Sequence, residues 1–196
     1  VISSTDPYLW MNAAEVTFLR AEGALRGWNM GGDAQALYEK AIALSFEERG
    51  GATGADQYVK DATKKPIDYV NPMDGADIKY SHSAVSTITI AWEPGAENFE
   101  RNLERIITQK WIAIFSLGLE AWAEHRRTGY PKLLPAVENK DPNNSVNVTI
   151  GPRRLPFPAD EYTGNPKEML NGPDAAGTKL WWDKKDHSIE NSQSSN

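Results

Sequence analysis

The chain contains no cysteine, and this absence excludes disulfide bonds, thiol catalysis and cysteine-ligated metal sites. Long apolar runs are missing too, since no stretch approaches the roughly 20 residues that a helix needs to cross a bilayer. The 21 basic residues are scattered through a chain of net charge −6, so no basic stripe could follow a phosphate backbone. We therefore expect no thiol chemistry and no nucleic-acid partner.

Short motifs of common catalytic and metal sites are also lacking. The sequence has no glycine-rich phosphate loop with its lysine and no Gly-x-Ser-x-Gly nucleophile elbow. The three histidines, His82, His125 and His187, lie far apart, and none has a second ligand at metal spacing. We expect no catalytic residue, no metal and no cofactor.

Helix periodicity is the main positive signal, because apolar residues recur at steps of three and four over long stretches. The predicted helices cover residues 7–26, 34–49, 97–117 and 119–127, with a short one at 54–62. Thr5-Asp6-Pro7 predicts the start of the first helix, Asp33 predicts the cap of the second, and Gly50-Gly51 predicts its end. Two such helices joined by a short turn form an antiparallel hairpin, here similar to a tetratricopeptide unit.

The predicted fold is mainly α, with tetratricopeptide-like helical hairpins, long loops and an irregular C-terminal segment. Its predicted parts are helical at 5–62, a long loop at 63–96, helical at 97–130 and irregular at 131–196. Within the last part we expect only a short strand at 146–150 and a brief helix near Glu168. The 63–96 loop is a candidate functional segment, because long loops on a rigid scaffold are often functional.

The aromatic residues form two groups. Four tryptophans lie on apolar helix faces, where packing in the core is predicted: Trp10, Trp28, Trp111 and Trp122. Three residues in or beside the long loop are candidates for stacking on a sugar or another flat ligand: Tyr69, Tyr80 and Trp92.

Glu120 and Glu124 stand one helical turn apart, which raises the possibility of a paired-carboxylate glycoside hydrolase. Glycosidase carboxylates face each other across a substrate, however, and usually come from different elements. Pairing with basic residues at the end of the helix, such as Glu124 with Arg127, is the simpler interpretation. The spacing therefore favours a structural role.

Several strings resemble the SusD/RagB family of Bacteroidetes outer-membrane lipoproteins. In chain order they are Glu15-x-x-Phe18-Leu19-x-Ala21-Glu22-Gly23-Ala24, Ala41-Ile42-x-Leu44-Ser45-Phe46-Glu47, Gln109-Lys110-Trp111 to Thr128-Gly129-Tyr130-Pro131, Pro152-Arg153-Arg154-Leu155-Pro156-Phe157-Pro158, Glu161-Tyr162 and Asn165-Pro166. The Trp181-Trp182-Asp183 string is similar to the ending of SusD-like members. The resemblance covers nearly the whole chain.

This resemblance implies a non-catalytic nutrient-binding lipoprotein, exposed at the cell surface, which captures starch, another glycan or a peptide. It would deliver that ligand to a partner TonB-dependent, SusC-like transporter. The chain would be the C-terminal part of a longer protein, whose missing N-terminal segment carries the signal peptide and the lipidated cysteine.

The same resemblance implies that the motif residues are fold determinants: Glu120, Trp122, Arg126, Arg127, Arg153 and Arg154. Buried arginine–carboxylate pairs and tryptophan anchors would hold the non-helical C-terminal segment against the helices.

Two other functions remain open. The chain could be a helical-repeat scaffold for protein–protein assembly, which exposed apolar faces on the first two helices would favour. An enzyme acting on glycans would need two acids facing a cleft, one with a raised pKa. Exposed stacking aromatics in the segment from Tyr69 to Trp92 would favour ligand capture.

Overall fold

The structure, a computed structural model, describes residues 5, 9–51, 53–72, 80–134, 136–138, 140, 146, 151–167, 169 and 174–183. Within these residues the chain is helical and forms one isolated β-bridge but no longer strand, so the predicted mainly α fold is confirmed. None of the described helices is long and apolar enough to span a membrane.

The chain divides into two compact units. Unit 1 comprises Val1–Ile67, Ala84–His125 and Tyr130–Lys132. Unit 2 comprises Asp68–Ser83, Arg126–Gly129 and Leu133–Asn196.

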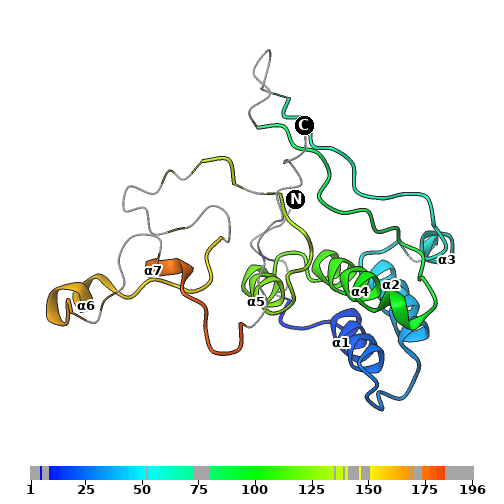
Figure 1. The fold of residues 1–196 in the computed structure, drawn as a ribbon. Coiled ribbons are helices and arrows are strands. Elements are labelled where there is room, and N and C mark those ends of the chain that lie inside the picture. Colours follow the sequence, from blue (N-terminus) through cyan, green and yellow to red (C-terminus); the bar gives the residue numbers. More distant parts are fainter. Residues whose placement is uncertain are drawn as a thin grey trace. The chain divides into compact units, whose positions relative to one another are not determined.

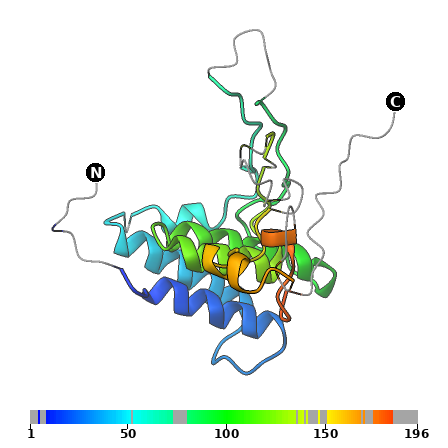
Figure 2. The ribbon, with the colours of Figure 1, turned by 90° about the vertical axis from the view of Figure 1, so that its left-hand side faces the viewer.

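Unit 1 is built around three helices that lie side by side (Figures 1 and 2): α1 (Ala13–Leu25), α2 (Ala34–Glu48) and α4 (Phe99–Ala113). Helix α1 packs against both α2 and α4. The unit also holds α3 (Ala55–Tyr58), η1 (Ala96–Asn98) and most of α5 (Gly118–Thr128). The side chain of Glu48, at the end of α2, accepts hydrogen bonds from the N–H groups of Ala13 and Ala14, which closes an antiparallel hairpin.

Helix α1 begins later than the sequence predicts. The side chain of Asn12, in an extended conformation, accepts a 2.7 Å hydrogen bond from the N–H of Glu15 and so caps the helix. Trp10 therefore precedes the helix and is 85% exposed. Pro7 lies outside the described residues, and residues 9–12 precede the helix, so the predicted helix is too long at its start.

Helix α2 begins and ends at its predicted signals. Asp33 caps its start, where the carboxylate accepts from the N–H of Ala36 at 3.0 Å. At the other end, the N–H groups of Gly50 and Gly51 donate to the carbonyls of Glu47 and Phe46. Gly50 has a φ of 73°, which glycine adopts without steric cost, so this pair of bonds ends the helix.

The core of unit 1 forms where the apolar faces of α1, α2 and α4 meet. Its fully or nearly buried members are Ala14, Phe18, Ala21, Leu37, Tyr38, Ala41, Ile42, Val59, Leu103, Ile106, Ile107 and Ala113. Three of the four tryptophans predicted in the core are exposed instead: Trp10, Trp28 and Trp111. Trp122 is half-buried.

Helix α4 ends at Ala113, four residues before the end of its predicted range. Ser116 has a φ of 86°, and this left-handed residue separates α4 from α5. The break therefore comes before Gly118, which is the first residue of α5.

Unit 2 contains short helices α6 (Ala159–Gly164) and α7 (Asp174–Gly177) within irregular chain. The helix predicted near Glu168 and the strand predicted at 146–150 lie outside the described residues, apart from Val146. The described bridge of the long loop joins Tyr69 and His82, whereas no strand forms at 85–90.

Candidate functional site

Tyr69 and His82 form the antiparallel bridge that arranges the candidate aromatic residues of unit 2. The N–H of Tyr69 donates to the carbonyl of His82 at 2.8 Å, and the N–H of His82 donates to the carbonyl of Tyr69 at 2.9 Å. Tyr80 is in a turn two residues before His82, so it lies close in sequence to this bridge.

Both of these tyrosines are accessible. Tyr69 is 47% exposed and Tyr80 is 39% exposed. An aromatic ring offers an apolar face for stacking, and its hydroxyl adds a hydrogen-bonding group at the edge. Two such rings near one bridge could bind a flat, polar ligand such as a sugar ring.

The third candidate, Trp92, is placed differently. It is half-buried and packs against the core of unit 1, with its ring centroid 5.5 Å from that of Tyr38. The hydroxyl of Tyr38 also donates a 2.7 Å hydrogen bond to the carbonyl of Ile90, in the same segment. The structure therefore does not bring Trp92 together with Tyr69 and Tyr80.

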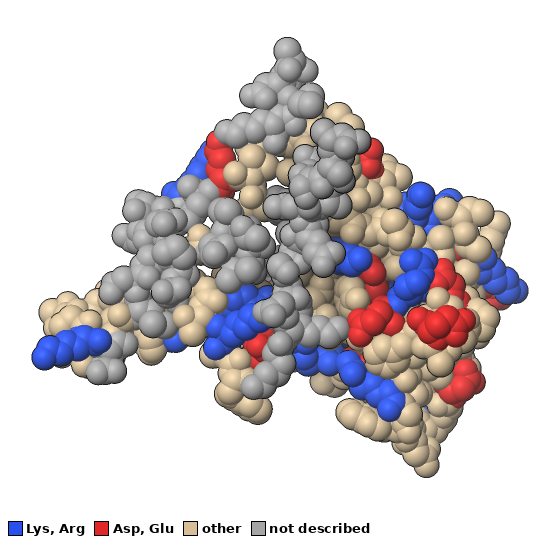
Figure 3. Space-filling view, in the orientation of Figure 1, with Lys and Arg blue, Asp and Glu red and all other residues tan. Residues whose placement is uncertain are grey.

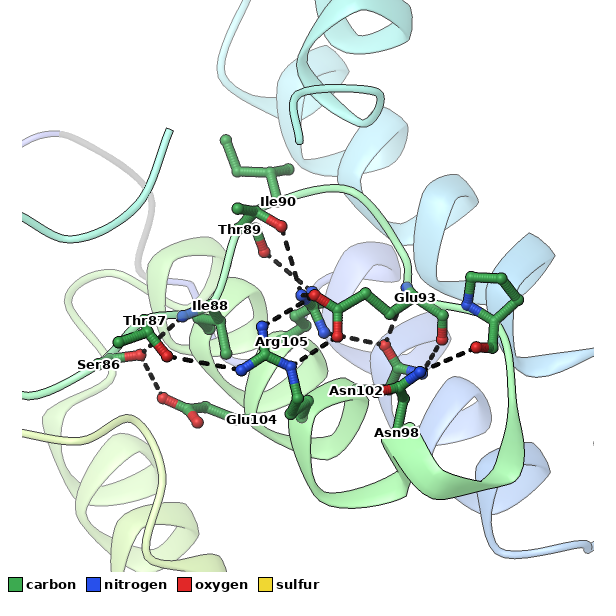
Figure 4. A network of polar contacts seen from close by, with 12 residues as sticks. Ser86, Thr87, Ile88, Thr89, Ile90, Glu93, Asn98, Asn102, Glu104 and Arg105 are labelled. Atoms are coloured by element: carbon green, nitrogen blue, oxygen red, sulfur yellow. Dashed lines mark hydrogen bonds and ion pairs between the residues drawn. The ribbon is translucent and has the colours of Figure 1, made fainter. Parts of the chain in front are cut away.

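A polar network, shown in Figure 4, binds the segment that carries Trp92 to helix α4. The carboxylate of Glu93 accepts hydrogen bonds from Arg101 at 2.6 and 2.8 Å and from Arg105 at 2.5 Å. The amide of Asn102 donates to the Glu93 carbonyl at 2.7 Å. The hydrogen bonds from the two arginines lower the pKa of Glu93 to about 2, and those from Arg101 make the largest contribution.

Glu104, a residue of α4, contacts two further segments of unit 1, which carry Ser86 and Lys132. Its buried carboxylate accepts a hydrogen bond from the hydroxyl of Ser86 and lies 3.6 Å from the ammonium of Lys132. Figure 4 shows Ser86 and Glu104 beside the Arg105 network. Figure 3 also shows acidic and basic side chains interspersed over unit 1.

Lys110 is the centre of a second charged cluster, which we call the Lys110 cluster, formed with Glu15, Glu120 and Glu124. The ammonium is 1% exposed and lies 2.9 Å from Glu124, 3.1 Å from Glu120 and 3.7 Å from Glu15. Glu120 and Glu124 thus bind an internal cation from another helix, a partner that their spacing did not predict.

Unit 2 has its own buried charges. Arg153, 1% exposed, binds both carboxylate oxygens of Asp183. Arg126, in the last turn of α5, donates to the Arg153 carbonyl at 2.9 Å, and Arg153 donates to the Arg126 carbonyl at 2.9 Å. The Trp182 ring lies 4.9 Å from the Arg126 guanidinium. Burial, followed by the charge of Arg153, lowers the pKa of Arg126.

The remaining motif residues are less buried. Arg154 stacks on Phe157 at 4.1 Å, and Trp122 and Arg127 are half-buried. The role of the motif residues as fold determinants stays a prediction, to which the contacts of Arg126 and Arg153 give a physical basis.

Sequence reasoning missed the residues that complete these clusters, above all Lys110 and Glu93. A signal for Lys110 was present, since it stands between Ile107 and Ile114 on the apolar face of α4. A charged residue within such a face is buried only when it finds partners. Glu93 offered no such signal, because it lies in a loop.

Comparison with known proteins identifies a matching family model and several similar solved structures. The family model described as SusD-like, "Susd and RagB outer membrane lipoprotein", matches residues 1–183. A solved SusD homologue from Bacteroides thetaiotaomicron is 48% identical with a TM-score of 0.82, and the match covers 95% of this chain and 40% of that one. A search of curated proteins found no match.

Two further solved structures are similar. A chitin-binding SusD homologue from Flavobacterium johnsoniae is 47% identical with a TM-score of 0.77, covering 90% of this chain and 36% of that one. A SusD homologue from Bacteroides ovatus is 42% identical with a TM-score of 0.80, covering 94% of this chain and 39% of that one. The chain therefore spans about two fifths of the length of these relatives.

Proposed function

Since the chain belongs to the SusD-like family of outer-membrane lipoproteins, we propose that it is part of a cell-surface protein that binds glycans without altering them. The observation that supports this proposal is the bridge between Tyr69 and His82, near which two exposed tyrosines, Tyr69 and Tyr80, lie in unit 2. The similarity to a chitin-binding relative supports a polysaccharide ligand.

The binding mode follows from the chemistry of the tyrosine pair. The Tyr69 and Tyr80 rings would stack on the C–H faces of successive sugar rings, while their hydroxyls would hydrogen-bond the sugar edges. Such contacts suit a neutral glycan, and starch and chitin-type chains both satisfy them. A peptide remains the alternative ligand.

Binding without hydrolysis is supported by the positions of Glu120 and Glu124. Both carboxylates bind Lys110, so this pair does not stand apart across a substrate as glycosidase acids do. The family resemblance adds that the complete protein would be lipid-anchored through an N-terminal segment. It would pass its ligand to a TonB-dependent transporter of the SusC type.

Affinity electrophoresis of the chain in gels containing starch, soluble chitin derivatives and other polysaccharides tests the proposal. The wild-type chain should be retarded by at least one of them, and Tyr69→Ala combined with Tyr80→Ala should abolish that retardation. Val70→Ala is the matched control, because Val70 is 74% exposed and follows Tyr69 in the same segment. Retention by the double variant would place the site elsewhere, and no retardation of the wild type would contradict glycan capture.

A second candidate function, protein–protein assembly, is favoured by one observation in unit 1. Large apolar side chains are exposed where α4 ends and α5 begins: Trp111, Ile112, Phe115 and Leu119. Exposed apolar side chains that gather in one region often mark an interaction surface. Sedimentation velocity with the transporter partner should show a complex that Phe115→Ser with Leu119→Ser weakens, and an unchanged complex would contradict this function.

A further inference from the structure

Among the residues that the structure describes, the Lys110 cluster gathers three carboxylates from two helices around one ammonium: Glu15 of α1, and Glu120 and Glu124 of α5. Glu15 is 3% exposed and Glu124 is 6% exposed, so water screens these two carboxylates only weakly, whereas the Glu120 side chain is 42% exposed.

Glu15 is the least satisfied of the three carboxylates. Lys110 donates hydrogen bonds to Glu124 and Glu120, whereas the Glu15 carboxylate lies 3.7 Å from the ammonium, beyond normal hydrogen-bond length. Oε2 of Glu15 is buried and has no hydrogen-bond partner among the described residues. An ionised carboxylate with a buried, unpartnered oxygen is strongly unfavourable beside two other carboxylates.

The other charged groups around the first turn of α1 do not relieve the unfavourable burial of an ionised Glu15 carboxylate. From α2, Glu48 accepts from the N–H groups of Ala13 and Ala14 and adds a further negative charge. Arg49, also from α2, donates to the carbonyls of Ala113 and Phe115 at the end of α4. From α5, the His125 ring contacts the Pro131 carbonyl at 3.1 Å.

We infer that Glu15 holds a proton in the folded chain at pH values where the unfolded chain has lost it, and that this proton closes the junction of α1, α4 and α5. Lys110 then faces two ionised carboxylates and one neutral carboxyl. Loss of the proton as pH rises leaves a buried charge without a partner and loosens the junction. The junction therefore weakens as pH rises through the folded pKa of Glu15.

The electrostatic surroundings of Glu15 support this. Burial raises its pKa above the ordinary 4.5, Lys110 opposes that shift, and Glu120 and Glu124 add to it. Because the folded pKa is the higher one, the folded state binds more protons between the two values. The stabilisation is complete below pH 4.5 and is lost as pH rises through the folded pKa. In that window, each pH unit lowers the folded-to-unfolded ratio by about tenfold.

Urea denaturation of the chain across a pH series tests the inference with Glu15→Gln, whose neutral amide mimics the protonated acid. The variant should match the wild type below pH 4.5 and become more stable than it as pH rises toward the folded pKa of Glu15, by about tenfold in the folded-to-unfolded ratio per pH unit within that window. Glu47→Gln, at an exposed position on α2, should keep the wild-type pH dependence. Equal pH dependence in wild type and Glu15→Gln would overturn the inference.

A measurement on the wild type keeps the test valid if the variant does not fold. Carbon-13 NMR of the Glu15 carboxyl, assigned through the backbone, should show it titrating above its ordinary pKa of 4.5. Titration of Glu15 at or below that value would overturn the inference.

Discussion

At the scale of single residues, buried arginines connect parts of the chain that are distant in sequence. Arg105 and Arg153 are each 1% exposed, and they bind Glu93 and Asp183, which stand 12 and 30 positions away. Taking such charges out of water costs several kcal/mol, and this cost is offset only when several hydrogen bonds are made together. Loss of one partner is therefore more damaging than the modest value of an ion pair suggests.

Glu93→Gln tests the network of Figure 4. The change removes the charge that binds Arg101 and Arg105, and we expect unit 1 to lose about 1–3 kcal/mol of unfolding free energy. The loss should stay below that of a fully buried pair, because the Glu93 side chain is 31% exposed. Urea denaturation followed by circular dichroism measures it. Glu97→Gln, on exposed η1, should have almost no effect.

The pH dependence of the same contact has the opposite sign to that of Glu15. The folded pKa of Glu93, about 2, lies below its ordinary 4.5, so its stabilisation is present above pH 4.5 and is lost as pH falls toward 2. Wild type should lose more stability than Glu93→Gln over this range. Parallel acid profiles for the two proteins would contradict the network.

Arg153→Lys tests the buried cluster of unit 2. Lysine keeps the positive charge but cannot bind both oxygens of Asp183 and the Arg126 carbonyl in the same fork geometry. We expect local destabilisation of about 2–3 kcal/mol, measured as faster amide exchange at Arg153, Arg154 and residues 181–183. Arg154→Lys is the control, since Arg154 stacks on Phe157 at the surface of the unit. Equal exchange in the two variants would contradict a special role for Arg153.

At the scale of elements, caps explain which helix boundaries could be predicted. For α2, the sequence contains both signals, Asp33 at the start and Gly50-Gly51 at the end, and each makes the expected hydrogen bonds. For α1, Thr5-Asp6-Pro7 and Asn12 both look like caps, and the local sequence does not decide between them. Asn12 also donates to the Ala113 carbonyl of α4 at 3.2 Å, a tertiary contact that no local pattern contains.

This difference predicts unequal costs for two cap substitutions. Asn12→Ala removes both the cap of α1 and the bond to α4, whereas Asp33→Ala removes a single exposed cap bond. We expect losses of about 1–3 kcal/mol for Asn12→Ala and about 0.5–1 kcal/mol for Asp33→Ala. Denaturation midpoints of the two variants decide the matter, and a larger loss for Asp33→Ala would argue against the tertiary role of Asn12.

The candidate site was predictable in part. Position in a long loop singled out Tyr69 and Tyr80 as candidates, and both are accessible, but the bridge between Tyr69 and His82 depends on a contact between residues 13 positions apart. Trp92 looked equivalent in sequence, yet it packs on Tyr38 because the Glu93 network holds its segment on α4. Tertiary contacts of this kind leave no periodic signal.

At the scale of the whole molecule, the chain corresponds to about two fifths of its solved relatives, and its two units carry different candidate surfaces. Unit 1 exposes apolar residues where α4 and α5 meet, as an assembly surface would. Unit 2 exposes the tyrosine pair, as a glycan-binding surface would. Both surfaces fit the proposed protein, which would hold a ligand and contact a transporter.

The most direct test of glycan capture is an NMR titration of the chain, with labelled tyrosine rings, against a soluble oligosaccharide. The oligosaccharide is derived from a polysaccharide that retards the chain in affinity electrophoresis. The account predicts that the ring signals of Tyr69 and Tyr80 shift together and saturate, while those of buried Tyr38 stay unchanged. Saturable binding that leaves Tyr69 and Tyr80 unmoved, or no binding of any glycan, would contradict it.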